Sequence, residues 1–125
     1  MAIDYDEAWR QAKAYIDAFN SHDLDAYLAQ FHDDVTHGST YVDDRTGQEN
    51  SFVNGKQAHR EYITWLWEQE PAWRNVLQEV FAGPHGYAFL TRLEPDGWQV
   101  VWVREIGADG LVRSQRLYRS RTPEG

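Results

Sequence analysis

The chain has 125 residues, the length of one domain, and 42% of them are apolar, so a disordered chain is excluded. It contains no cysteine, which excludes a disulfide framework, a thiolate metal site and a cysteine nucleophile. The net charge of −8 would repel a phosphate backbone, and no segment has the pattern of a signal peptide or a membrane span. We therefore expect a cytoplasmic protein with neither a nucleic-acid nor a membrane partner.

Apolar residues at helical spacing predict two helices at the start of the chain. Asp23 is expected to cap the second, short helix, because its carboxylate can accept from the free N–H groups of the first turn. Phe31 would belong to the apolar stripe of this helix, and Asp33 and Asp34 would end it. The first helix is expected over residues 6–20, with a stripe formed by Trp9, Ala12, Ile16 and Phe19.

The middle of the chain predicts a short strand over residues 35–41, a polar loop over 43–50 and a third helix over 56–69, which Pro71 stops. The second half reads as strands, because turn residues separate segments that alternate between apolar and polar side chains. This order of helices followed by an antiparallel meander is an α+β pattern. The four expected strands of the meander cover residues 73–82, 87–93, 98–106 and 111–119.

The expected strand over 98–106 is apolar on both of its faces. Trp98, Val100 and Trp102 lie on one face, and Val101 and Val103 lie on the other. A sheet with one face in water would alternate cleanly between apolar and polar residues. We therefore predict that helices cover one face and that a second subunit covers part of the other, in a homodimer formed through the sheet.

Three stretches of the sequence carry a family resemblance. They are YIDAFNSHDLDAY at 15–27, FHDDV at 31–35 and NGKQA at 54–58. In this order, and followed by a meander, they resemble the SnoaL-like and ketosteroid-isomerase-like branch of the nuclear transport factor 2-like superfamily. The resemblance implies one domain over residues 1–125. It would fold as a cone-shaped α+β roll, with N-terminal helices on a curved, mostly antiparallel sheet around an apolar pocket.

The resemblance also assigns residues to the catalytic positions of the steroid isomerase. Tyr15 aligns with the tyrosine that donates to the developing enolate oxygen, Ser39 with the aspartate base, and Trp102 with the second donor. A serine hydroxyl is not a base at neutral pH, and an indole does not exchange a proton. The sequence therefore argues against a standard ketosteroid isomerase.

His37 is the remaining candidate for proton transfer, because an ordinary histidine titrates near neutral pH. The two-residue period of a strand places His37 and Ser39 on one side, facing the pocket if the odd-numbered residues point inward. Two plainer interpretations stay open at this point. Tyr15 can be a core tyrosine, and His37 can be a hydrogen-bonded histidine at the surface of the strand.

Other residues fill out the expected pocket. Tyr62 and Phe89 would form its walls together with Trp102, and Arg104 would either reach the rim or hold an anionic ligand group. His59 is expected to be solvated on a helix face. The histidines and aspartates over residues 32–37 match no metal-ligand spacing, so we predict neither a metal nor a cofactor.

A second branch of the superfamily uses an Asp-Arg-Asp relay, as in limonene-epoxide-hydrolase-like proteins. Arg92 and Glu94 resemble part of that relay, but the last expected strand offers no carboxylate to complete it. The leading hypothesis is therefore a SnoaL-like protein that isomerises, dehydrates or cyclises a small apolar carbonyl or hydroxyl compound without a cofactor. The alternatives are a non-catalytic ligand-binding module and a dimeric association module.

Overall fold

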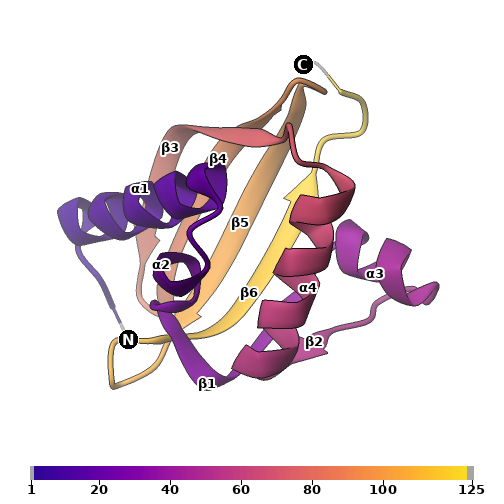
Figure 1. Cartoon of the computed structure of the whole chain (residues 1–125). Coiled ribbons are helices and arrows are strands. Elements are labelled where there is room, and N and C mark those ends of the chain that lie inside the picture. Colours follow the sequence, from indigo (N-terminus) through magenta and orange to yellow (C-terminus); the bar gives the residue numbers. More distant parts are fainter. Residues whose placement is uncertain (1, 124–125) are drawn as a thin grey trace.

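The computed structural model describes residues 2–123, and in it the four helices and two strands of the first part of the chain are followed by four consecutive strands (Figure 1). Along the chain the elements are α1 (Tyr5–Ser21), α2 (Leu24–Leu28), β1 (Phe31–Gly38), α3 (Thr40–Thr46), β2 (Val53–Asn54), α4 (Lys56–Gln69), β3 (Arg74–Gly83), β4 (Gly86–Glu94), β5 (Trp98–Ile106) and β6 (Val112–Arg119).

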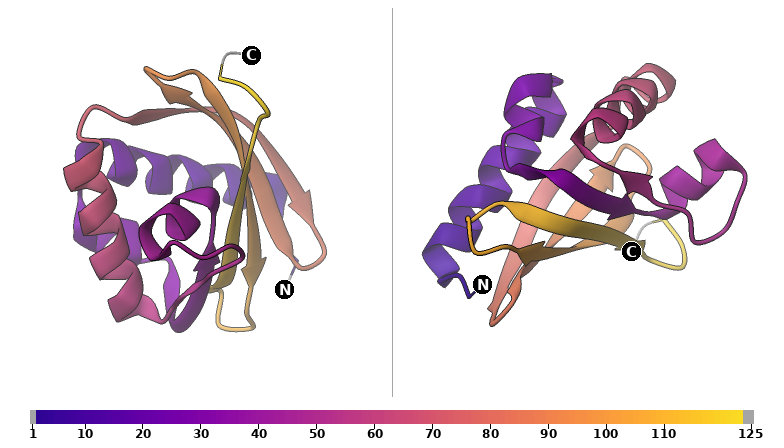
Figure 2. Two further views of the ribbon diagram at one scale, coloured as in Figure 1. Left: turned by 90° about the vertical axis from the view of Figure 1, so that its right-hand side faces the viewer. Right: turned by 90° about the horizontal axis from the view of Figure 1, so that it is seen from below.

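One six-stranded sheet, in the order β2-β1-β6-β5-β4-β3, organises the fold. The strands β3 to β6 form the expected antiparallel meander, and β1 adds to it in parallel with β6. The register of β3 shifts between Leu77 and Glu79, and such irregularities bend a strand and increase its twist. The two views of Figure 2 show α1 and α4 on one side of this curved sheet. The expected α+β roll is confirmed.

The first helix begins and ends as capping rules require. The Asp4 side chain accepts from the backbone N–H of Glu7 at 2.8 Å, and His22 ends the helix in the left-handed conformation, with φ 55°. Trp9 belongs to the predicted apolar stripe but is 37% exposed, whereas Ala8 is buried. The buried face is therefore rotated slightly from the predicted one, and small residues let α1 approach the sheet closely.

The segment from Phe31 to Thr46 corrects the sequence prediction. Phe31, Asp33 and Asp34 do not end the second helix but belong to β1, whose backbone pairs with β6. The predicted strand over 35–41 and loop over 43–50 are replaced by a strand that ends at Gly38, followed by α3. The hydroxyl of Ser39 accepts from the backbone N–H of Val42 at 3.2 Å and starts this helix.

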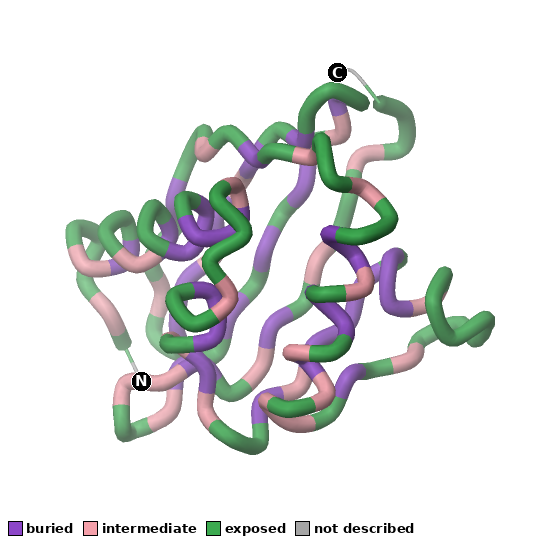
Figure 3. Tube along the Cα trace, viewed as in Figure 1, coloured by how far each residue is buried: buried purple, intermediate pink, exposed green. Residues whose placement is uncertain are grey.

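The two faces of the sheet differ in burial, as Figure 3 shows by the alternation of colours along the strands. In β5, Trp102 and Arg104 are buried on the helix-covered face, while Val101 and Val103 on the outer face are 38% and 40% exposed. The predicted assignment of these residues to two opposite faces of the strand is therefore confirmed. No helix among residues 2–123 is long and apolar enough to cross a membrane.

Candidate functional site

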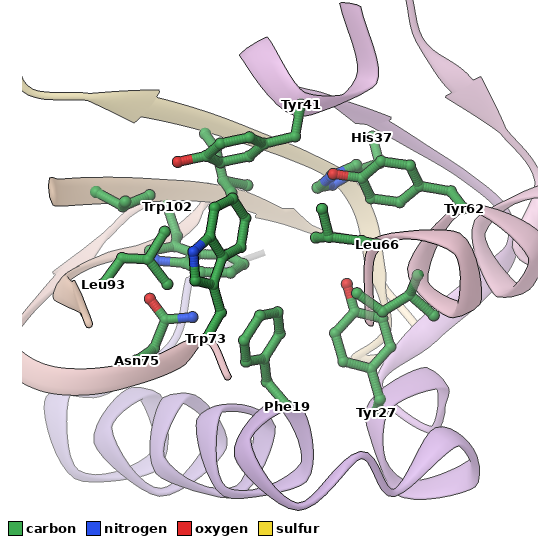
Figure 4. A pocket seen from close by; sticks show the side chains of 13 residues that line it. Phe19, Tyr27, His37, Tyr41, Tyr62, Leu66, Trp73, Asn75, Leu93 and Trp102 are labelled. Atoms are coloured by element: carbon green, nitrogen blue, oxygen red, sulfur yellow. The ribbon is translucent and has the colours of Figure 1, made fainter. Parts of the chain in front are cut away.

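A cavity of about 20 Å³ lies between the helices and the inner face of the sheet (Figure 4). This volume accommodates about one water molecule. Side chains from α1, α2, β1, α3, α4 and the meander meet around it, so its wall is assembled from most of the chain. The lining residues are Phe19, Tyr27, His37, Tyr41, Tyr62, Ile63, Leu66, Trp73, Asn75, Leu93, Val100, Trp102 and Leu117.

The wall of the cavity is aromatic and carries no net charge near neutral pH. No carboxylate, lysine or arginine is among its described lining residues. Burial raises the pKa of Tyr62 and of Tyr27 above the ordinary value for a phenol. Burial, assisted by the charge of Arg104, lowers the pKa of His37 to about 3, so the imidazole is neutral at physiological pH.

A chain of hydrogen bonds runs behind this wall from Arg104 to His37. Arg104 Nε donates to Gln115 Oε1 at 2.6 Å. Gln115 Nε2 lies 2.9 Å from the hydroxyl of Tyr15 and 3.1 Å from Nδ1 of His37. Because the amide oxygen of Gln115 faces the guanidinium, its NH₂ group has both hydrogens available for Tyr15 and His37.

This arrangement fixes the tautomer of His37. Nδ1 accepts from Gln115, so the single proton of the neutral ring resides on Nε2. That Nε2 is buried and has no hydrogen-bond partner within residues 2–123. The imidazole therefore brings an unpaired N–H donor to the wall of the cavity. The expected titration near neutral pH is not found, because burial in an apolar setting disfavours the charged ring.

Arg104 lies in the interior, so the expectation that it reaches the rim is wrong. Its exposed fraction is 2%, and its Nη1 donates to Gln30 Oε1 at 2.6 Å and to the hydroxyl of Tyr87 at 2.8 Å. The guanidinium lies over the ring of Tyr15, 4.0 Å from the centroid. Neutral acceptors and an aromatic face therefore solvate this cation in place of a carboxylate, and the guanidinium does not line the cavity.

His59 is also buried, although the sequence predicts a solvated position. It lies on the inner face of α4, where its Nε2 is 2.9 Å from the hydroxyl of Tyr27. Its ring stacks on His37 with centroids 4.5 Å apart and on Phe31 at 4.6 Å. Desolvation lowers the pKa of His59 well below the ordinary value, and the neighbouring His37 adds to this effect.

The other candidates fall into two groups around the cavity. Tyr62 and Trp102 line it, and Figure 4 shows the Tyr62 ring beside His37. Tyr15, Ser39 and Phe89 lie behind the lining residues. Phe89 stacks on Trp102 with centroids 5.2 Å apart, and the Ser39 hydroxyl is 3.5 Å from that of Tyr62.

The indole N–H of Trp102 is already used by the protein. It donates to the Thr91 hydroxyl at 2.9 Å, and Thr91 donates in turn to Asn75 Oδ1 at 2.7 Å. Trp102 is therefore a wall of the cavity, and its N–H is not available to a ligand. Thr91 and Asn75, which hold the indole in place, lie on neighbouring strands and gave no motif in the sequence.

Sequence reasoning also missed the residues that close the cavity on its outer side. The rings of Tyr41 and Trp73 meet edge to face, with centroids 5.2 Å apart, and both line the cavity. Tyr41 belongs to α3, which the sequence does not predict, and Trp73 immediately precedes β3. The sequence signal that could have identified them is that both are aromatic and stand at the ends of predicted elements. Within residues 2–123, histidines, aspartates and glutamates form no group of three that could hold a metal ion.

The fold has clear relatives among solved structures. The chain is similar to a SnoaL-like protein of unknown function from Burkholderia thailandensis, with 24% identity, coverage of 94% of this chain and 98% of that chain, and a TM-score of 0.86. It is also similar to a Mycobacterium tuberculosis protein in complex with estradiol-17β-hemisuccinate, with 21% identity, coverage of 91% of this chain and 94% of that chain, and a TM-score of 0.66.

A candidate ketosteroid isomerase from Kribbella flavida is a third similar structure, with 17% identity, coverage of 93% of this chain and 79% of that chain, and a TM-score of 0.71. These identities are low, so the likenesses show a shared fold. No curated protein matches the chain. The sequence itself matches the SnoaL-like domain over residues 12–113, which is most of its length. The chain therefore belongs to the SnoaL-like domain family.

Proposed function

We propose that the protein binds a small apolar ring compound that carries an acceptor oxygen, and that His37 Nε2–H donates to this oxygen. The observation that carries the proposal is the unpaired Nε2 of His37 in the wall of an aromatic cavity. An unsatisfied buried donor costs about 1–3 kcal/mol. An acceptor oxygen on a ligand would remove that cost, while the surrounding rings would pack against its apolar part.

Entry of a ring requires the cavity to widen, because its present volume accommodates about one water molecule. Tyr41 and Trp73 close its outer side, and Trp73 is only partly buried. Rotation of these two side chains would join the cavity to the surface. We assign them the role of a gate through which the ligand enters.

A catalytic role for the same site is the second candidate function. The chain from Arg104 through Gln115 holds the His37 donor in place, and such a donor can polarise a carbonyl during an isomerisation or dehydration. Tyr15 would act through Gln115, as a positioning residue. The neutral wall offers no carboxylate base, and the low pKa of His37 makes it a weak base, so the geometry favours binding over proton abstraction.

We also propose that the protein forms a homodimer through the outer face of the sheet. The strand register places Phe81, Ala88 and Val103 in one row, and Val101 opposite Tyr118 in the next. Phe81 and Tyr118 are more than half exposed. A second copy would cover this apolar surface. The cytoplasmic location stays a prediction from the sequence.

The binding proposal is tested with two similar compounds. 2-Acetylnaphthalene carries a carbonyl oxygen, and 2-isopropylnaphthalene has a methyl group in its place. Titration followed by tryptophan fluorescence should show about tenfold tighter binding of the ketone, the value of one hydrogen bond. His37→Phe and His37→Gln should both reduce that preference. His85→Phe, which alters an exposed turn residue, is the control. Equal binding of the two compounds to the unaltered protein would refute the assigned donor.

Catalysis is tested separately by following exchange of the ketone methyl protons in D₂O by NMR. Enolisation at the site would exchange them faster than buffer does, and His37→Gln would abolish the difference. The binding proposal predicts exchange at the buffer rate while the ketone is bound.

A further inference from the structure

A second hollow, of about 300 Å³, lies directly outside the gate, and we call it the mouth cleft. It shares Tyr41, Leu66 and Trp73 with the inner cavity, so a ligand that passes the gate must cross it. Its lining includes the first residue of β5, the last residue of β6 and the last turn of α4. Its chemistry differs from that of the cavity and indicates which polar group a ligand would place there.

Indole rings dominate the apolar part of the mouth cleft, and two of them already hold cations. The guanidinium of Arg119 lies 4.1 Å from the ring centroid of Trp98, and that of Arg45 lies 5.8 Å from that of Trp65. Trp73 contributes a third indole to the lining. Aromatic faces attract cations through their quadrupole. The protein's own arginines therefore show that these faces are oriented to receive positive charge.

Carboxylates add to this preference. Asp44, Glu70 and Asp96 line the cleft against Arg119, so its lining side chains carry a net charge of −2. Arg45, which lies over the lining ring of Trp65, reduces this to −1 for the cleft and its immediate surroundings. Within residues 2–123 none of the three forms an ion pair with Arg119. Asp96 accepts only from the indole N–H of Trp73, at 3.2 Å, among the described contacts. The negative charge of the cleft is therefore not neutralised by the arginine that it contains.

The Tyr41 hydroxyl is a further polar group beside the carboxylates of the cleft. Tyr41 is 7% exposed and lines both the cleft and the cavity. Its hydroxyl makes no hydrogen bond of good geometry in the described part of the chain, and the guanidinium of Arg119 lies nearby, 5.6 Å from the centroid of its ring. Burial raises the pKa of this phenol against the opposing charge of Arg119, so it remains a neutral donor and acceptor. A protonated amine beside it could donate to the phenol oxygen and to a carboxylate at once.

We infer that the mouth cleft binds a protonated amine on the ligand whose apolar ring occupies the inner cavity. The inference rests on the proposed function, because the ring must enter through the gate that the two hollows share. The substrate class is thus an apolar ring compound with an alkylammonium group on a short tail. The ammonium would lie among the indoles and the carboxylates, and it would compete with Arg119 for the face of Trp98.

The test uses three probes that share a naphthalene ring: 2-(2-naphthyl)ethylamine, 2-(2-naphthyl)ethanol and 2-naphthylacetate. At neutral pH the first is a cation, the second is neutral and the third is an anion. Fluorescence titration at low salt should show the amine binding about tenfold more tightly than the alcohol, and the acetate more weakly than both. The preference should shrink at about 0.5 M NaCl, because salt screens exposed charges.

The variant Asp44→Asn/Glu70→Gln/Asp96→Asn should lower the affinity for the amine about tenfold more than the affinity for the alcohol, and so abolish the preference for the amine. The amide that replaces the carboxylate of Asp96 would keep an acceptor for Trp73, so the loss would report charge and not packing. The control Asp6→Asn/Glu61→Gln/Glu105→Gln changes the net charge equally at exposed positions outside the cleft and should keep the preference.

The outcomes separate this inference from the proposed function. If the alcohol binds and the amine has no advantage, or if the control variant loses the advantage equally, the cleft assignment is overturned and the proposed function stands. If none of the three probes binds, both fail.

Discussion

The two faces of β5 show how one strand serves two purposes. On the inner face, Arg104 is buried and takes part in a network that reaches Gln115 and His37. On the outer face, Val101 and Val103 are partly exposed. The inner face therefore carries buried core and the proposed binding site, and the outer face carries partly exposed apolar surface. Changes on the two faces should have different consequences.

Acid should unfold the protein through the inner face, and this is the largest expected effect. The pKa of His37 is about 3 in the folded chain against an ordinary value of 6.5, and that of His59 is lowered as well. At acidic pH the two histidines are therefore protonated in the unfolded chain but remain neutral in the folded chain. The free energy of unfolding is unaffected by the titration of these histidines at a pH above their ordinary pKa. As the pH falls from the ordinary pKa toward the lowered pKa of the folded chain, this free energy decreases by about 1.4 kcal/mol per pH unit for each histidine.

Urea unfolding between about pH 7.5 and 4.5 measures this dependence. His37→Phe and His59→Phe should each flatten it, whereas the exposed His85→Phe should not. An equal slope in the unaltered protein and in the double variant His37→Phe/His59→Phe would contradict the buried neutral pair.

Removal of the buried cation comes next in size. Arg104→Met leaves the acceptors on Gln30, Tyr87 and Gln115 without their donor, and we expect a loss of about 3 kcal/mol in the free energy of unfolding. Arg116→Met, at the neighbouring strand position on the exposed outer face, is the matched control and should cost less than about 0.5 kcal/mol. Similar losses in the two variants, measured by urea unfolding, would remove the distinction between the faces.

Charges on the outer face should break association but not folding. Val101→Glu/Val103→Glu should raise the dissociation constant of the dimer at least about a hundredfold. Covering the 38% and 40% of the two valines that are exposed contributes roughly 1–2.5 kcal/mol per subunit, and the two introduced carboxylates would resist burial as well. Sedimentation equilibrium should show a dimer for the unaltered protein and a monomer for the variant. The monomeric variant should still unfold cooperatively in urea, because the substitutions lie outside the core. A monomeric unaltered protein at micromolar concentration would contradict the dimer.

The smallest effect concerns the gate. Trp73→Ala removes one of the two rings that close the inner cavity, so 2-acetylnaphthalene should associate a few-fold faster in stopped-flow fluorescence. Trp9→Ala, which removes a partly exposed indole of α1 that does not line the cavity, is the control. An unchanged rate in the Trp73 variant would place the entrance elsewhere.

Local sequence predicted most of the fold because its elements depend on near neighbours. The strand alternation of β5 and the helix cap formed by Asp23 need only local geometry. The segment from Phe31 to Thr46 differs from its prediction because Phe31 continues a helical apolar spacing, whereas pairing with β6 requires a strand there. Tertiary pairing overrode a local pattern that was itself consistent with a helix.

The candidate site also separates what local sequence predicts from what tertiary contacts decide. The sequence by itself, with the family resemblance, predicted that Tyr62 and Trp102 form walls of the cavity, and both line it. It left open whether His37 faces the pocket or the surface, because that depends on the register of β1. Only the tertiary structure decided that His37 is neutral, that its proton is on Nε2 and that Arg104 is internal. The neutral state of His37 depends on its burial and on the charge of Arg104. The position of its proton depends on Gln115, which lies 78 residues away along the chain and beside it in space.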